Sequence, residues 1–144
     1  MTKGQYKFIH FTSYLTIIHG VLYWIIKEFF QIQSEYGLRP HYFQTYIQAA
    51  HILLSPLLVV SFGLLWQKHI VHFFKKKSRK LITGSVVTIS LVIIIISGYL
   101  IQVIYAQPGK SIITWVHLIF SGLYLLAYLG HHFLSLKKNS KKKA

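Results

Sequence analysis

The chain alternates between four long apolar runs and shorter segments that hold most of its charged residues. The runs extend over Phe8–Phe30, Phe43–Trp66, Leu81–Tyr105 and Ile112–Leu136. Each run is long enough to cross a bilayer as a helix, since about 20 apolar residues span roughly 30 Å of hydrocarbon. Pro56 interrupts the hydrogen bonding of the second run, and we expect Ser55 to satisfy part of the freed backbone. The pattern predicts an all-α integral membrane protein, a bundle of four transmembrane helices.

The distribution of charge predicts how this bundle is oriented. The 144 residues are 53% hydrophobic and include two acidic residues against sixteen Lys and Arg. Thirteen of the sixteen basic residues lie in the N-terminal segment, in the loop between the second and third runs, or in the C-terminal tail. Because basic residues concentrate on the cytoplasmic side of a membrane protein, we expect both termini in the cytoplasm. We also expect one four-helix membrane domain, residues 1–136, and a basic cytoplasmic tail, residues 137–144.

The net charge of +14 also suggests nucleic acid as a partner. The basic residues stand at the ends of the apolar runs, however, as membrane topology requires, so we predict a lipid bilayer as the partner and no nucleic acid. The chain has no cysteine. It therefore has no disulfide, no thiolate metal site and no covalently attached haem of the CxxCH type.

Histidines inside the apolar runs are the candidate functional residues, because an imidazole is costly in hydrocarbon. His117 and His131 are fourteen residues apart, which places them about 40° apart on one helix face and about 21 Å apart along the axis. The second and fourth runs both enter the membrane from the outer side. His51 and His117 therefore lie at a similar depth. Two imidazoles hold a low-spin haem suited to electron transfer. We therefore expect His51 and His117 to ligate one haem near the outer surface.

A second haem is expected near the inner surface, with His131 as one ligand. His10 lies near the start of the first run, at matching depth. His69 lies eighteen residues after His51 and on the same helix face, but about 27 Å away along the axis, against about 21 Å for the pair in the fourth run. We favour His10 as the second ligand and keep His69 as the alternative. On the fourth run, His132 is the alternative to His131, turned about 100° from it.

The remaining signals are weaker. Gly84 and Gly98 are also fourteen residues apart, and their missing side chains let a macrocycle or a neighbouring helix approach closely. Helix packing and haem binding both explain this pair. His19 lies near the middle of the first run and is expected to line the bundle or a quinone pocket. Two further histidines are expected at the membrane surface: His41 and His72.

Four spans with histidines in this arrangement resemble the di-haem cytochrome b membrane subunits of formate dehydrogenase and nickel–iron hydrogenase. The resemblance covers Phe8–Leu136. In that family the outer haem is held by the second and fourth spans, and the inner haem by the first and fourth. The resemblance therefore implies these ligand pairs: His51 with His117, and His10 with His131.

A second resemblance keeps the inner site open. The segments HILLSPLLVVSFGLLWQKHI, SGYLIQV and WVHLIFSGLYLLAYLGHH also resemble a group of small bacterial membrane proteins without an assigned function. In that group the histidine that matches His69 is part of the pattern.

The expected function is that of a b-type cytochrome in a bacterial inner membrane, with two haem b groups. It would carry electrons between quinone and a redox partner, such as a c-type cytochrome or an oxidoreductase subunit. We expect an electron-transfer subunit of a respiratory complex rather than a stand-alone enzyme. One alternative is a quinone-binding anchor with one haem or none, for which Gln102 and Tyr105 are candidate contacts. The other is a structural membrane protein in which the histidines only pack helices.

Overall fold

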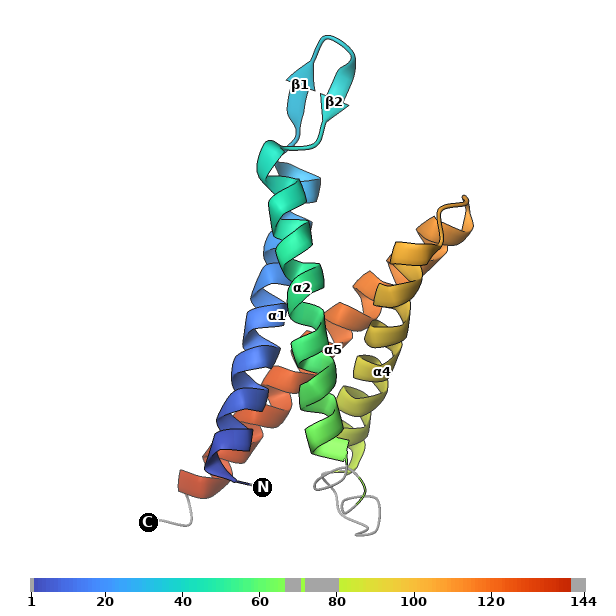
Figure 1. Ribbon diagram of the computed structural model, residues 1–144. Helices are drawn as coiled ribbons and strands as arrows, with labels where there is room; N and C mark the ends of the chain where they lie inside the picture. Colours follow the sequence, from blue (N-terminus) through green and yellow to red (C-terminus); the bar gives the residue numbers. More distant parts are fainter. Residues whose placement is uncertain (1, 67–70, 72–80, 141–144) are drawn as a thin grey trace. The chain divides into compact units, whose positions relative to one another are not determined.

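The chain forms four long helices and one short β-hairpin in the computed structural model (Figure 1). The structure describes residues 2–66, 71 and 81–140, and the side chains within 2–66, 71 and 84–132. In chain order the elements are α1 (Lys3–Phe29), β1 (Ile32–Ser34), β2 (Gly37–Arg39), α2 (Tyr42–Leu65), α4 (Leu81–Val103) and α5 (Gly109–Ser140). Each of these four helices is long and apolar enough to cross a membrane. The four predicted helices are therefore confirmed.

The helices pair into two separate compact units. α1 packs against α2, and α4 packs against α5. Figure 1 shows α1 and α2 side by side, with the β-hairpin at the end away from the N-terminus. Each unit is thus a helical hairpin, in which one helix can support side chains carried by the other.

The N-terminus of α1 is fixed by a capping box. The Thr2 hydroxyl accepts a hydrogen bond from the Gln5 backbone N–H at 3.2 Å, and the Gln5 side-chain oxygen accepts from the Thr2 N–H at 3.0 Å. Two backbone donors that a helix start leaves without partners are satisfied in this way. As a result α1 begins at Lys3, before the apolar run itself.

The segment between α1 and α2 is an antiparallel β-hairpin. Ile32 pairs with Arg39, and Ser34 pairs with Gly37. Gly37 has φ 103°, a conformation that a residue with a side chain rarely adopts. The Ser34 hydroxyl donates to the Gly37 carbonyl at 2.6 Å, and the Arg39 guanidinium lies 5.5 Å from the centroid of the Tyr36 ring. Strands of three residues are too short to show a period of two in the sequence, so the pattern of polar positions missed them.

Helix α2 continues through Pro56. Proline has no N–H, so the carbonyl of Ile52 loses its helical donor. The Ser55 hydroxyl donates to that carbonyl at 2.8 Å, which confirms the role expected for Ser55. At the start of α2, Nδ1 of His41 accepts from the Phe43 N–H at 3.2 Å. His41 is therefore the N-cap of the helix.

Small hydroxyl residues form the centre of the α1–α2 interface. Thr12 and Ser61 are both about fully buried, and their hydroxyl oxygens are 2.6 Å apart. The Ser61 hydroxyl also lies 3.0 Å from the Leu57 carbonyl, and the Thr12 hydroxyl 3.0 Å from the Phe8 carbonyl. Small polar residues of this kind let two helix backbones approach closely in an apolar environment.

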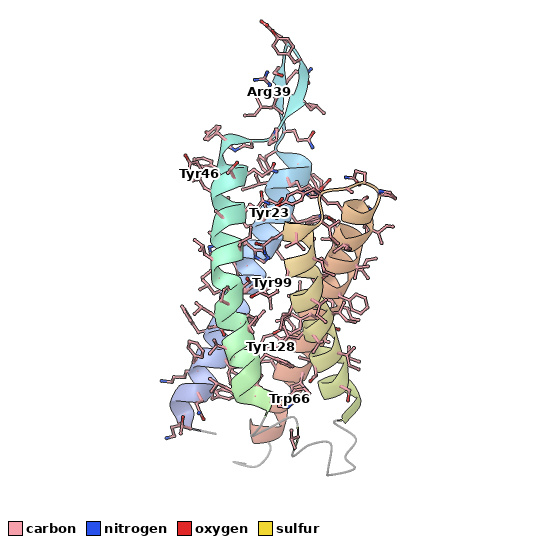
Figure 2. All side chains as sticks on the ribbon, turned by 45° about the vertical axis from the view of Figure 1, so that its right-hand side comes forward. Tyr23, Arg39, Tyr46, Trp66, Tyr99 and Tyr128 are labelled. Carbon is pink, nitrogen blue, oxygen red and sulfur yellow. The ribbon has the colours of Figure 1, made fainter. Side chains whose placement is uncertain are left out.

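The α4–α5 interface is built from larger side chains on one of its helices. Tyr124 and Tyr128 of α5 are buried, with ring centroids 5.6 Å apart. Figure 2 labels Tyr128 within this hairpin. On α4 the buried side chains are Ser90, Leu91 and Ser97. Aromatic stacking thus takes the place that paired hydroxyls hold in the first hairpin.

Candidate functional site

The first hairpin holds His51 of α2 against Gly20 of α1. A Cβ added at Gly20 would lie 3.0 Å from Cε1 of His51, so any larger residue there would require the ring to shift by a few tenths of an ångström. Nδ1 of His51 is buried and has no hydrogen-bond partner among the described residues. Buried polar atoms are normally satisfied, and one that is not calls for an explanation such as a bound group.

The second hairpin holds His117 of α5 against Gly98 of α4. A Cβ added at Gly98 would lie 3.3 Å from Cε1 of His117. The close approach expected at Gly98 is therefore present, and its partner is a helix that carries a candidate ligand. At Gly84 an added Cβ would meet no described atom within 4 Å. Of these two glycines, only Gly98 therefore contacts a candidate ligand among the described residues.

Ser97 lies at hydrogen-bonding distance from Nδ1 of His117. Its hydroxyl oxygen lies 3.0 Å from Nδ1 of His117 and 3.2 Å from the Ile94 carbonyl. When the single hydroxyl proton is directed to the Ile94 carbonyl, the Ser97 oxygen accepts from Nδ1–H of His117. In the neutral imidazole this arrangement makes Nε2 the nitrogen with the lone pair, which is the one a metal binds.

His19 is anchored inside α1, one residue before Gly20. Its Nδ1 lies 2.9 Å from the Leu15 carbonyl, one helical turn earlier. Because the carbonyl is an acceptor, Nδ1 carries the proton and Nε2 of the neutral ring is an acceptor. The sequence placed His19 in the bundle interior but did not indicate that it stands next to the glycine under His51. In the sequence, a polar residue directly precedes the glycine in both cases: His19 precedes Gly20 in the first run, and Ser97 precedes Gly98 in the third.

The inner candidates have aromatic surroundings on their own helices. The His10 ring lies 4.2 Å from the Tyr6 centroid and 6.4 Å from the Tyr14 centroid, on the preceding and following turns of α1. His132 stacks on Tyr128 at 6.4 Å with an interplanar angle of 15°. His131 is half-buried on α5. His69 and His72 lie outside the described residues.

The candidate ligands are divided between the two hairpins. His10 and His51 belong to the α1–α2 unit, and His117 and His131 to the α4–α5 unit. Within the described residues, no three His, Asp or Glu side chains form a group able to hold a metal ion by themselves. A haem iron is held by one or two protein ligands, since the macrocycle supplies the others.

The residues present fit haem as the bound group. A ligand histidine usually donates its second ring N–H to an oxygen, which fixes the ring and its tautomer. His117 has that partner in Ser97. His51 and His117 each contact a glycine of the neighbouring helix, Gly20 and Gly98.

Comparisons of the chain with protein-family models, with curated proteins and with solved structures find no match. The functional proposal therefore rests on the histidines, on their tautomers and on the glycines that they contact.

Proposed function

We propose that this chain is a di-haem b-type membrane cytochrome that carries electrons across a bacterial inner membrane. The observation that carries the proposal is the state of His117. Its Nδ1 is hydrogen-bonded to Ser97 and its ring lies on Gly98, and in the tautomer with the proton on Nδ1 the nitrogen that would bind a haem iron is Nε2. In the first hairpin, His51 on Gly20 repeats the contact between ring and glycine.

The proposed outer haem takes His51 and His117, one ligand from each hairpin. The proposed inner haem takes His131 with His10, and His69 is the alternative to His10. Both assignments require the two hairpins to join as one four-helix bundle in the membrane. The distribution of basic residues supports cytoplasmic termini for that bundle.

Aromatic residues support the membrane placement of the helices. Figure 2 shows Tyr46 and Trp66 at opposite ends of α2. Both side chains are exposed in the structure. Tyr and Trp at the two ends of an apolar helix are typical of the two membrane surfaces, where an amphipathic ring lies at the level of the headgroups.

A bound haem of this kind supplies reversible one-electron transfer. Two histidine ligands on each haem would leave the iron no open position for substrate chemistry. The apolar helices keep water from the ligand imidazoles. The redox reactions at either end then belong to the partners, which we propose are quinone and a protein such as a c-type cytochrome or an oxidoreductase subunit.

The proposal is tested by the visible spectrum of detergent-purified protein, oxidised and then reduced with dithionite, with a pyridine haemochrome count. The expected result is a low-spin b-type spectrum and two haems per chain. A count of one haem or less favours the quinone-binding anchor. The absence of a Soret band, in protein produced with ample haem, contradicts the proposal and leaves a structural membrane protein.

A further inference from the structure

The two hairpins repeat one another around their histidines. Four residues of α1 recur in α4 with a shift of 78 residues, and four residues of α2 recur in α5 with a shift of 66. The residues that recur on α1 and α4 are Ile17, Ile18, Gly20 and Leu22, as Ile95, Ile96, Gly98 and Leu100. Those that recur on α2 and α5 are Ile47, His51, Ser55 and Leu57, as Ile113, His117, Ser121 and Leu123.

The burial of the side chains follows the same register. Residues 49–60 of α2 and 115–126 of α5 show the same order of exposed, half-buried and buried positions at every step. The one buried position in each range is Leu58 in the first and Tyr124 in the second. Residues 11–22 of α1 and 89–100 of α4 agree except at the pairs 16/94 and 19/97. The contact between Gly20 and His51 is thus the equivalent of the contact between Gly98 and His117.

The register places His19 at the position of Ser97. Each residue directly precedes the glycine on which the histidine of its own hairpin lies. The Ser97 hydroxyl is hydrogen-bonded to Nδ1 of His117. His19 has its own Nδ1–H committed to the Leu15 carbonyl, so its Nε2 is an acceptor.

His51 has the complementary need. Its Nδ1 is buried without a hydrogen-bond partner among the described residues, and both the Thr16 backbone and the His19 ring of α1 act electrostatically on the imidazole. When Nε2 of His51 binds a metal, Nδ1 must carry the proton and requires an acceptor. Nε2 of His19 is an acceptor at the equivalent position.

We propose that Ser97 and His19 are equivalent positioning residues, which accept the Nδ1–H of His117 and of His51 and so leave Nε2 of each histidine as the nitrogen that binds haem iron. This inference rests on the proposed function. An acceptor at Nδ1–H makes the ligand imidazole more basic and holds its ring in place. A more basic ligand favours the ferric state, so loss of the acceptor raises the reduction potential of the haem.

The test uses matched variants of the full chain. Ser97→Ala removes the acceptor, and Ser97→Thr keeps a hydroxyl. Ser90→Ala is the control, because Ser90 is buried two turns earlier on α4 and loses the same atom. In the other hairpin, His19→Leu removes the acceptor and His19→Gln supplies an amide oxygen in its place.

Potentiometric titration of the haem spectra gives the first readout. We expect Ser97→Ala and His19→Leu each to raise the potential of the same haem and to weaken its retention about 10-fold. A tenfold change in the preference for ferric over ferrous haem corresponds to about 59 mV for one electron. Ser97→Thr, His19→Gln and Ser90→Ala are expected to stay near the parent protein. A shift in Ser97→Ala no larger than in Ser90→Ala overturns the inference while leaving the proposed function intact.

The second readout is ¹⁵N NMR of histidine-labelled protein without haem. The parent protein should show His117 as the Nδ1–H tautomer, and Ser97→Ala should show a mixture of tautomers. A parent protein that binds no haem overturns the proposed function, and an unchanged His117 tautomer in Ser97→Ala overturns the positioning role of Ser97.

Discussion

The two hairpins hold a histidine on a glycine in the same way, but their interiors are closed by different chemistry. In α1–α2 the hydroxyls of Thr12 and Ser61 are hydrogen-bonded at 2.6 Å. At the equivalent position of the second hairpin Ala127 replaces Ser61, and stacked tyrosines of α5 fill the interface. Helix packing alone would allow either hydrogen-bonded hydroxyls or stacked aromatic rings at every position. The retained feature is the contact between glycine and imidazole, which supports a role for the histidines beyond packing.

The inner candidates do not follow the repeat. The residue equivalent to His131 is Leu65, and the residue equivalent to His10 is Thr88. A haem held by His10 and His131 would therefore use non-equivalent positions of the two hairpins, whereas His51 and His117 are equivalent. This difference predicts that the outer and inner sites respond differently to substitution.

The largest expected effect concerns the ligand that α5 supplies to the inner haem. His131→Ala should reduce the haem content from two to one per chain, because the iron loses an axial ligand. His132→Ala is the matched control and should retain two, since His132 lies on Tyr128. Haem per chain is measured by pyridine haemochrome. Loss of a haem in His132→Ala alone would assign the ligand to His132.

The other ligand of the inner haem is tested by His10→Ala and His69→Ala, made singly. We expect His10→Ala to leave one haem per chain and His69→Ala to leave two. The opposite result would assign the second inner ligand to His69. In that case both sites would be formed by the second and fourth spans.

A smaller effect is expected when a methyl group is added under each outer ligand. Gly20→Ala and Gly98→Ala would bring a Cβ to 3.0 and 3.3 Å from an imidazole carbon, and overpacking of this kind costs about 1–3 kcal/mol. Gly20→Ala should be the more damaging of the two. Thermal loss of the Soret band measures the effect. Gly63→Ala and Gly84→Ala are the controls, because an added Cβ there meets no described atom within 4 Å; equal damage in the controls would remove the glycine argument.

The smallest expected effect concerns the hydroxyl pair that distinguishes the hairpins. A double-mutant cycle of Thr12→Val and Ser61→Ala should give a coupling free energy of about 0.6 kcal/mol, the average for hydrogen bonds between membrane helices. Unfolding in mixed detergent measures it. Ser90→Val with Ala127→Ser is the reference cycle in the second hairpin, where the parent protein has no hydroxyl at position 127. Coupling near zero for Thr12 and Ser61 would show that close packing alone stabilises the interface.

The helices were predictable from the sequence because a membrane span is defined by one property, a long apolar run. The role of Ser55 beside Pro56 was also predictable, since the freed carbonyl and the hydroxyl are near neighbours in the helix. The capping role of His41 and the strands around Gly37 were missed. Both depend on local backbone geometry within a few residues, which leaves little trace in hydropathy.

The candidate site was predictable only in part. Depth and helix face selected His51 and His117, but the partners of an imidazole depend on the rotation of the neighbouring helix. Ser97 and Gly20 therefore emerged only from the structure. The internal repeat is present in the sequence, but only a few of its residues are identical. It becomes recognisable because the two hairpins also share the same order of buried and exposed positions.

The central claim is that the equivalent histidines of the two hairpins serve one and the same haem. The most direct test is the haem content of His51→Ala, His117→Ala and the double variant, each measured per chain by pyridine haemochrome. The account predicts that all three retain one haem, because either substitution already removes the outer site and the second removes nothing more. A double variant without haem, beside single variants that each retain one, would show that His51 and His117 serve different haems and would contradict the account.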